Sequence, residues 1–248
     1  MRKFTLMATL ALLAGCGNGA TTSLDRFAAD GRVIGLSGAG AGAANACFTC
    51  HGLDGRGDGA GAPRLAGLDA GYLERQLDAY ADGRRYHAQM GWIAKRLDAR
   101  ERRAVSTFYA AMPVAPGTPA SIAPERLYHR GDPARGLVAC AACHGEQGQG
   151  VGPANPPLAG QPAAYLAEQL DQWRKAKRRN DPGDVMLRIS QLLTPAEQRL
   201  LTAYAARLPG GPASREYPAA SPSARRGDPR NDASGPPLHV PESARAGR

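Results

Sequence analysis

Two short segments of this chain carry the same arrangement of two cysteines and one histidine, and this arrangement limits its possible folds more than any other feature. Residues 47–51 read CFTCH and residues 140–144 read CAACH, and a glycine follows each histidine. Side chains at positions i and i+3 of a helix lie on the same face. Each segment therefore presents two thiols side by side, with an imidazole immediately after them.

Two thiols in this geometry can add across the two vinyl groups of one haem, while the following histidine reaches the iron. A zinc site shared by both segments is disfavoured, because about 90 residues separate them and zinc ribbons use about 15–20. A redox-active or structural disulfide would need neither the histidine nor a second copy. The pattern therefore predicts two covalent haem c groups, attached through Cys47, Cys50, Cys140 and Cys143, with the iron ligands His51 and His144.

The similarity between the two segments continues far beyond the histidines. After a shift of 93 residues, CHGLDGRGDGAGAPRLAGLDAGYLERQLDAY aligns with CHGEQGQGVGPANPPLAGQPAAYLAEQLDQW. A short insertion follows in the second copy, and further pairs then align: Met90 with Met186, Ile93 with Ile189, Leu97 with Leu193, and Glu101 with Glu197. The chain is therefore a tandem duplication of a unit shorter than 90 residues, and each copy carries a complete site.

Each copy has the pattern of three helices joined by loops. The CxxCH segment is predicted to close a first helix, which in the second copy starts at Asp132 and Pro133. Apolar residues at helical spacing predict a middle helix over 72–80 and again over 165–173. A capping box opens the last helix of each copy, predicted over 98–112 and 194–208.

The predicted fold class is all-α, because no segment has a convincing strand pattern. It comprises two tandem domains, each with one covalent haem c, joined by a short Pro-rich linker. The end of the chain is rich in Pro, Ser, Gly and Arg and poor in apolar residues, which predicts a disordered tail. The predicted boundaries are a signal peptide at 1–15, a lipidated N-terminus and spacer at 16–37, domains at 38–113 and 131–210, a linker at 114–130 and a tail at 211–248.

The fifth cysteine, Cys16, belongs to the N-terminal segment. Arg2 and Lys3 precede an apolar stretch of about a dozen residues, which is too short to span a bilayer at about 20 residues. The stretch ends in LAGC, which resembles the lipobox of bacterial lipoproteins, where the thiol of the cysteine carries diacylglycerol. Cys16 is therefore the predicted lipidation site. Gly17 stands where the inner-membrane retention signal of enteric bacteria has Asp, which favours the outer membrane.

A second axial ligand for each iron must come from the chain. His87 and Met90 are the candidates after His51, and Met186 is the candidate after His144. The repeat alignment pairs Met90 with Met186, and both are predicted to lie in a loop just before a helix. Met90 and Met186 are therefore the predicted axial ligands, with His87 as the rival in the first domain. Met112, late in an amphipathic helix, is predicted to serve packing instead.

The two copies resemble class I cytochromes c, and the pair resembles the dihaem cytochrome c4 family. The resemblance rests on PxLAGxxxxYLxxQLxxY/W followed by MxxIxxxL and covers about residues 38–210. It implies His–Met coordination of each iron and electron transfer in the bacterial periplasm. It also implies that the carbonyls of Pro63 and Pro156 accept hydrogen bonds from the two histidines. Tyr72 and Tyr165 would either bind a haem propionate or fill the core.

An iron with two protein ligands has no open position for substrate, which argues against peroxidase, oxygenase or gas-binding chemistry. The chain is therefore predicted not to be an enzyme but an electron carrier of the periplasmic respiratory chain. It would take electrons from a quinol-oxidising complex and pass them to a terminal oxidase or another acceptor. The alternative is a cytochrome electron-acceptor subunit of a periplasmic dehydrogenase, similar to a flavocytochrome.

The formal charge of +9 does not predict a nucleic-acid partner. The two domains are nearly balanced, with ten Lys and Arg against eight Asp and Glu in residues 38–113, and nine against seven in 131–209. The densest basic run is RKAKRR at 174–179, which is a candidate docking patch for an acidic redox partner. The predicted partners are thus redox proteins and, through the lipid anchor, the membrane.

The lipid anchor can be tested by replacing the thiol at its attachment point. Cys16→Ser should move the protein from the membrane fraction to the soluble fraction without loss of haem, because the acyl chains supply about 0.8 kcal/mol per buried methylene. Haem staining after denaturing electrophoresis of both fractions measures the outcome. A wild-type protein that is already soluble would contradict the prediction.

Overall fold

The computed structural model describes residues 23–114 and 125–210, with side chains from residue 30 onward. Within these residues there are helices, turns and three isolated bridges but no strand, so the all-α prediction is confirmed. The signal segment with Cys16, most of the predicted linker and the tail lie outside the described residues.

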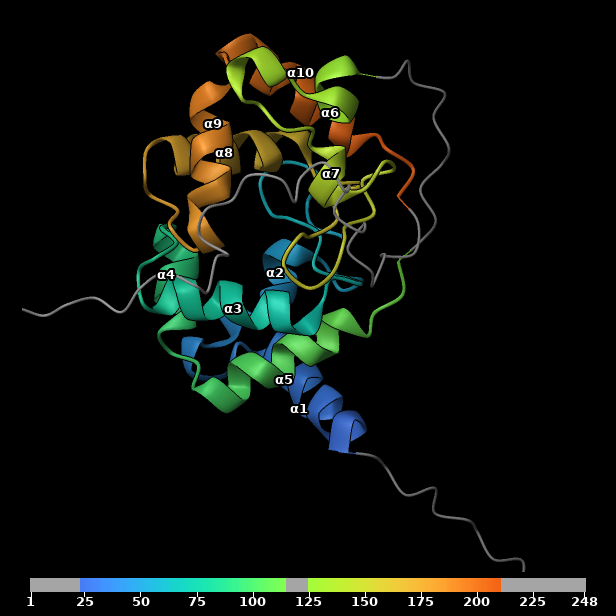
Figure 1. Cartoon of the computed structure of the whole chain (residues 1–248). Helices are drawn as coiled ribbons and strands as arrows, with labels where there is room; N and C mark the ends of the chain where they lie inside the picture. Colours follow the sequence, from blue (N-terminus) through green and yellow to red (C-terminus); the bar gives the residue numbers. More distant parts are fainter. Residues whose placement is uncertain (1–22, 115–124, 211–248) are drawn as a thin grey trace, which may run out of the picture.

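The first domain contains five α-helices. They are α1 (Ser23–Ser37), α2 (Cys47–His51), α3 (Ala70–Ala81), α4 (Ala88–Ala94) and α5 (Ala99–Ala110). Two 3-10 turns, Ala39–Ala41 and Ala43–Asn45, join α1 to α2. Helices α3 and α5 pack on each other, and α1 lies along α5 at one end of the molecule (Figure 1).

The second domain repeats most of this plan. It contains α6 (Arg126–Arg130), α7 (Ala141–His144), α8 (Ala163–Arg174), α9 (Val185–Leu192) and α10 (Pro195–Ala206). Two 3-10 turns, Pro133–Arg135 and Pro182–Asp184, precede α7 and α9. Helices α8 and α10 correspond to α3 and α5, so the duplication in the sequence is a duplication of the fold.

The start of each domain differs from the prediction. The CxxCH segments form short helices of their own instead of closing longer ones. Helix α1 lies in the segment assigned to the spacer and packs against α5, so the first domain begins earlier than residue 38. A Cβ at Gly31 would lie 2.1 Å from the carbonyl oxygen of Ala104, so the glycine permits the close approach of the two helices. Helix α6 likewise lies in the predicted linker.

Each domain has its own hydrophobic core. The apolar faces of the helices meet there, as their spacing predicts. The largest buried side chains of the first core are Ile34, Leu68, Tyr72, Leu73, Ile93, Leu97, Val105 and Tyr109. The second core contains Leu127, Tyr128, Leu137, Leu166, Leu193, Leu201 and Leu208. Each domain is therefore built around a core of its own.

The predicted capping boxes are present at α5 and α10. Asp98 accepts a hydrogen bond from the backbone of Glu101, whose side chain accepts one from Asp98, and Thr194 and Glu197 do the same. Each cap satisfies two donors that the first turn leaves unpaired. The helices end at Ala110 and Ala206, two residues before the predicted ends.

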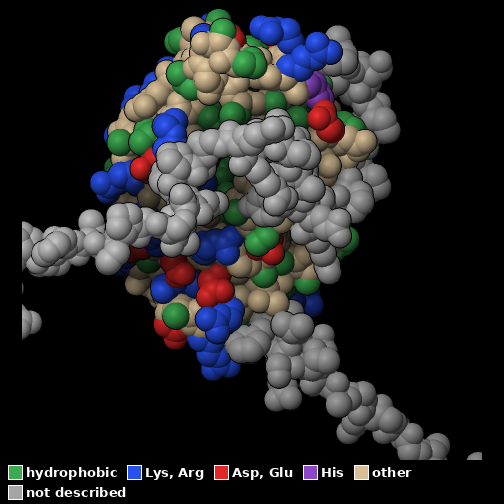
Figure 2. Space-filling view, in the orientation of Figure 1, with side chains coloured by type: hydrophobic (Ala, Val, Ile, Leu, Met, Phe, Trp, Pro, Cys, Tyr) green, Lys and Arg blue, Asp and Glu red, His purple; other side chains and the backbone are tan. Residues whose placement is uncertain are grey.

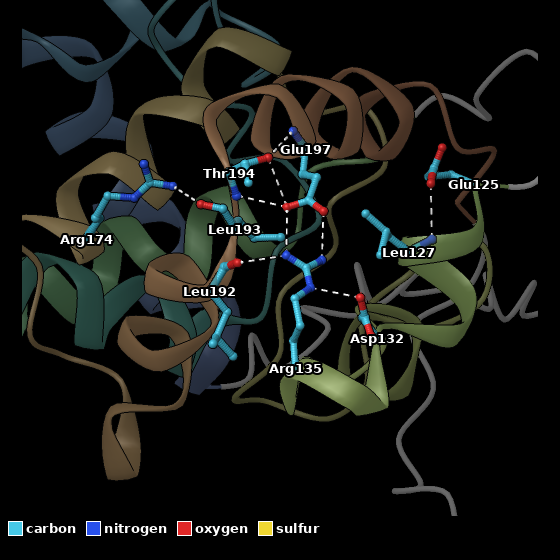
Figure 3. A network of polar contacts seen from close by, with 9 residues as sticks. All are labelled: Glu125, Leu127, Asp132, Arg135, Arg174, Leu192, Leu193, Thr194 and Glu197. Atoms are coloured by element: carbon cyan, nitrogen blue, oxygen red, sulfur yellow. Dashed lines mark hydrogen bonds and ion pairs between the residues drawn. The ribbon is translucent and has the colours of Figure 1, made fainter.

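A network of polar contacts ties the start of the second domain to its last helix (Figure 3). Arg135 donates to Asp132 over 2.8 Å and to Glu197 over 2.7 Å. Its guanidinium therefore joins the loop before α7 to the capping box of α10. Arg174 donates to the carbonyl of Leu193 over 2.6 Å, and so supplies a hydrogen-bond partner for a backbone carbonyl between α9 and α10.

The two domains meet along a short pair of equivalent segments. The backbone N–H of Tyr86 donates to the carbonyl of Lys177 over 2.9 Å, and that of Arg179 donates to the carbonyl of Arg84 over 2.7 Å. The shift of 93 residues exchanges these two bonds, so the domains are related by a local pseudo-twofold axis between Arg85 and Arg178. These two arginines form an isolated antiparallel bridge.

A second contact between the domains surrounds Arg64. Its backbone N–H donates to the side chain of Gln161 over 3.0 Å, and Gln161 donates back to the carbonyl of Arg64 over 2.9 Å. The guanidinium donates to the carbonyl of Ala159 over 3.1 Å. Both Arg64 and Gln161 are buried, so these bonds replace bonds to water.

Among the described residues, no single helix is long and apolar enough to cross a membrane. The segments Asp30–Ala41 and Ala43–His51 pass the test of length and composition only as a pair, bent by 116°.

The turn before each interface segment gives a stability prediction. Gly83 has φ 81°, whereas its repeat counterpart Ala176 is held at φ 53°, a conformation that costs a residue with a Cβ about 1–2 kcal/mol. Ala176→Gly should therefore stabilise the protein by up to about 1 kcal/mol, and Gly83→Ala should destabilise it by a similar amount. Urea midpoints of the haem-loaded protein measure both changes. A lower midpoint for Ala176→Gly would contradict the prediction.

Candidate cofactor sites

The first domain contains a cavity of about 260 Å³ next to its CxxCH segment. Cys47, Cys50 and His51 of α2 line it together with Met90 of α4 and apolar side chains of α3. The second domain contributes to the wall through Tyr165 and Gln169 of α8. The structure therefore brings the predicted attachment cysteines and both predicted axial ligands of the first domain to one cavity, which reaches the domain interface.

His51 is buried and held in one orientation. Its Nδ1 lies 2.9 Å from the carbonyl oxygen of Pro63. A carbonyl can only accept, so Nδ1 carries the proton and Nε2 keeps its lone pair for a metal. Burial lowers the pKa of His51, and the bond to Pro63 opposes this shift only in part. The imidazole is therefore neutral near pH 7, as coordination requires.

The second domain repeats this arrangement. The Nδ1 of His144 donates to the carbonyl oxygen of Pro156 over 2.8 Å. Burial lowers the pKa of His144, and the nearby positive charge of Arg178 adds to the effect. The carbonyls of Pro63 and Pro156 thus accept the hydrogen bonds from the two histidines that the family resemblance implies.

A loop with glycines at fixed positions brings each proline back to its histidine. The N–H of Gly57 donates to the carbonyl of His51 over 2.8 Å, and Gly150 makes the same bond to His144. Both glycines have φ 81°. A Cβ at Gly57 would lie 2.3 Å from the carbonyl oxygen of Ala62, so a side chain would push the loop away from the imidazole.

The four cysteines are not paired as disulfides. Burial raises the pKa of Cys47 and of Cys140 to about 11. A redox-active CxxC motif needs a lowered thiol pKa, so these pairs do not have that character. In the part of the chain that the structure describes, no three His, Cys, Asp or Glu side chains are grouped to hold a metal ion.

The two methionines lie inside helices, where the sequence had predicted loops. Met90 is in the first turn of α4 and Met186 in that of α9, and both are half-buried. Their backbone N–H groups are capped by upstream side chains, His87 at 3.2 Å for Met90 and Asp181 at 2.7 Å for Met186. The chain is a loop only as far as the capping residue, His87 or Asp181. The capped backbone that follows is already helical, so each methionine lies in the first turn of a helix.

His87 stays a rival to Met90 in the first domain. Its side chain lines the same cavity as His51 and Met90. Its Nδ1 accepts the hydrogen bond from the backbone of Met90, which leaves Nε2 as the nitrogen that could bind iron. The second domain has no histidine at the equivalent place. Met112 packs against the first core, as predicted.

The two tyrosines that the sequence connected with a propionate or the core lie at the domain interface. The hydroxyl of Tyr165 accepts a hydrogen bond from Arg85 over 2.8 Å, and that of Tyr72 accepts one from Arg178 over 3.4 Å. No sequence pattern pointed to Arg85, and Arg178 was notable only as part of the basic run at 174–179. The repeat alignment could have identified them, because the shift of 93 residues pairs an arginine with an arginine at these two positions.

The basic run at 174–179, the candidate docking patch, is divided in the structure: Lys175, Lys177 and Arg179 are exposed, whereas Arg174 and Arg178 make contacts within the fold. Arg174 is bound to carbonyls of its own domain, Lys175 pairs with Asp171, and Arg178 is buried between the domains with 4% of its surface exposed. Figure 2 shows Lys and Arg interspersed with Asp and Glu on the visible face. Two arginines of the run therefore hold the fold and the interface together, and a docking role for the three exposed residues stays a prediction.

The residues present at the two sites fit haem c. Each has two thiols and a neutral histidine with a free Nε2. In the first domain Met90 of α4 lines the same cavity as the histidine, and in the second Met186 of α9 stays the predicted ligand. The lining of the first cavity is mostly apolar, as a porphyrin requires. When bound, each haem supplies a one-electron couple at its iron. The chain contributes the attachment, the orientation of the imidazole and the exclusion of water.

Comparison with known proteins identifies the fold. The cytochrome c family model matches residues 37–113 and 133–208. A thiosulfate dehydrogenase electron acceptor from Stutzerimonas stutzeri (strain A1501) is 45% identical over 190 residues, which is 73% of this chain and 88% of that protein.

Two solved structures are similar over most of the described residues. Reduced recombinant cytochrome c4 from Pseudomonas stutzeri has a TM-score of 0.62 at 25% identity, covering 73% of this chain and 97% of that chain. The thiosulfate dehydrogenase TsdBA from Marichromatium purpuratum, as isolated, has a TM-score of 0.65 at 38% identity. That match covers 82% of this chain but only 44% of that longer chain.

The axial methionines can be tested one domain at a time. Oxidised haem c with His–Met ligation has a weak far-red band from sulfur-to-iron charge transfer, and Met90→Ala or Met186→Ala should each remove about half of it. Each change should also lower the potential of its own haem, because thioether ligation raises it. Optical spectra and redox titration of the purified protein measure both effects.

His87→Ala is the matched control for the first domain. It should leave the far-red band and the first potential nearly unchanged. If His87→Ala alters the first haem while Met90→Ala does not, the first iron has two histidine ligands and the methionine assignment is wrong.

Proposed function

The chain belongs to the cytochrome c family, as a tandem dihaem member resembling cytochrome c4, and from that premise we propose that it is the electron acceptor of a thiosulfate dehydrogenase. Electron transfer through two covalent haem c groups is the function its relatives share. The proposal adds the electron donor, and it chooses the dehydrogenase partner over a quinol-oxidising complex.

The observation that carries the proposal is the similarity to an electron acceptor of this kind. The chain is 45% identical to the Stutzerimonas stutzeri protein over 88% of that protein's length. A second thiosulfate dehydrogenase electron acceptor, from Thiomonas intermedia, is 39% identical over 177 residues. The match within the TsdBA chain supports the same pairing, because a unit of this fold occurs there as part of a thiosulfate dehydrogenase.

The stoichiometry of the reaction suits a dihaem protein. Joining two thiosulfate ions through a new S–S bond to give tetrathionate releases two electrons. Two one-electron sites can take both electrons of one turnover. The chain itself makes no bond to thiosulfate in this scheme, since the enzyme holds the substrate and the cytochrome takes only electrons. A terminal oxidase or another acceptor would then reoxidise it.

The site geometry agrees with a role in transfer alone. His51 and His144 each have one nitrogen bound to a carbonyl and one left for iron, and Met90 and Met186 would supply the second ligands. With both positions filled, substrate has no place at either metal. We further propose that lipid on Cys16 tethers the protein in the periplasm, at the outer membrane.

The donor can be tested by direct reduction. Oxidised holoprotein should be reduced by thiosulfate only when a thiosulfate dehydrogenase is added, and should take two electrons per molecule. Stopped-flow absorbance at the haem bands measures the rate and the amplitude. A variant with Cys47→Ala and Cys50→Ala should take one electron, because it keeps only the second site.

A quinol-oxidising complex is the alternative electron donor, and the same reduction experiment distinguishes it from the dehydrogenase. If ascorbate reduces the protein but thiosulfate with the dehydrogenase does not, and a quinol-oxidising complex does, the proposed donor is wrong and the respiratory carrier remains.

A further inference from the structure

The carboxylate of Asp181 joins two helices of the second domain. Its Oδ1 accepts a hydrogen bond from the indole N–H of Trp173, in the last turn of α8, over 2.8 Å. Its Oδ2 accepts one from the backbone N–H of Met186, in the first turn of α9, over 2.7 Å. Both oxygens are therefore engaged, and the charge of the carboxylate strengthens each bond.

The indole is a firm support for this carboxylate. Trp173 is buried, with 9% of its surface exposed. The guanidinium of Arg178 stacks over its ring, 3.9 Å from the centroid. A buried and stacked indole has little freedom to turn, so it fixes the carboxylate with respect to α8.

The turn that leads into α9 needs such a support. The chain from the CxxCH histidine to the methionine is three residues longer in the second copy than in the first. Just before α9, Gly183 has φ 65° and Asp184 has φ 54°. A residue with a Cβ is strained in this left-handed region, so the turn persists only where other contacts hold it. Asp184 itself makes no side-chain bond to the start of α9.

The far end of α9 is also held by α8. Arg174 donates to the carbonyl of Ser190 over 3.1 Å and to that of Leu193 over 2.6 Å. Two adjacent residues of α8, Trp173 and Arg174, therefore hold both ends of the helix that carries Met186, the first of them through the carboxylate.

The first domain holds its methionine with different groups. The backbone N–H of Met90 donates to the imidazole of His87 over 3.2 Å. Tyr80 stands at the position of Trp173, and its ring meets that of His87 edge to face at 6.4 Å between centroids. A ring contact thus takes the place of the hydrogen bond between indole and carboxylate, and the arrangement around Asp181 belongs to the second domain.

We propose that Asp181 is a positioning residue for the second iron, because it fixes the start of α9 so that the sulfur of Met186 stays on the metal. The proposal rests on the prediction that Met186 is the axial ligand there. When the turn opens, the sulfur leaves and a ligand from solvent can take its place. The bonds of Asp181 keep the fraction of open sites low, in the second domain alone.

The test is an imidazole titration of the oxidised, haem-loaded full chain. Imidazole reaches an iron only when the methionine has left it, so its apparent affinity rises with the fraction of open sites. Loss of the far-red band measures binding. Met186→Ala identifies which part of the band belongs to the second site.

Asp181→Asn keeps the size of the side chain and removes its charge. An amide has one acceptor oxygen and one donor group, so it cannot accept from both Trp173 and Met186. The variant should raise the affinity of the second site for imidazole about tenfold, because a hydrogen bond to a charged acceptor is lost. The first site, whose methionine is held by His87, should stay unchanged.

Two further variants separate the hydrogen bond from the charge. Asp184→Asn is the matched control, since it removes the same charge from an exposed carboxylate in the same turn. It should leave both affinities unchanged. Trp173→Phe combined with Asp181→Asn keeps an aromatic ring beside Arg178 and should restore the affinity of the wild type, because the amide oxygen is then free to accept from Met186 alone.

Three results would overturn the proposal. The first is an unchanged second affinity in a folded Asp181→Asn protein. The second is an equal increase in Asp184→Asn, which would assign the effect to charge. The third is a Met186→Ala variant that does not open the second iron, because no ligand would then need positioning.

The double variant keeps the test decisive if Asp181→Asn does not retain its second haem. It must then retain that haem and bind imidazole as the wild type does, and its failure overturns the proposal as well. These measurements use neither thiosulfate nor a partner protein. They can therefore fail while the thiosulfate dehydrogenase pairing holds, and the reverse is also true.

Discussion

The hydrogen bond from the CxxCH histidine, the predicted iron ligand, to a proline carbonyl is the interaction on which each half of this molecule depends. It joins the CxxCH helix to the far end of a twelve-residue loop, at 2.9 Å in the first domain and 2.8 Å in the second. The bond settles which ring nitrogen carries the proton, and thereby which one is free for iron. Glycines at positive φ let the loop return to the histidine, and the loop then supplies residues such as Leu65 and Leu158 to the haem pocket side of each core.

The contact between the domains follows a second constraint, which is symmetry. A duplicated chain presents the same surface twice, so a segment that can pair with its own copy makes two equivalent bonds at once. The segments around Arg85 and Arg178 do this with two backbone bonds and a crossed set of side-chain bonds. One buried surface therefore holds the domains together and places residues of the second domain on the wall of the first cavity.

The two halves are not identical, and the differences mark where their roles can diverge. His87 lines the first cavity and has no histidine counterpart in the second domain. Helix α1 packs along α5, whereas α6 is only five residues long. In the second domain His129 lies 2.7 Å from Tyr204 and also contacts Glu146, where the first domain has apolar side chains at the aligned positions. Such differences allow one electron-transfer unit to give two haems with unequal surroundings.

The sequence by itself determined the chemistry of this protein. The attachment cysteines, the axial histidines, the duplication and the all-α class follow from local spacing, because a thiol pair at i and i+3 and a capping box act within one helix turn or two. Tertiary structure decided what depends on distant contacts. It brought Met90 of α4 to the same cavity as Cys47 and His51 of α2. It buried Arg178 of the basic run at the domain interface, because this arginine meets Arg85 of the other domain, a contact that no local pattern can identify.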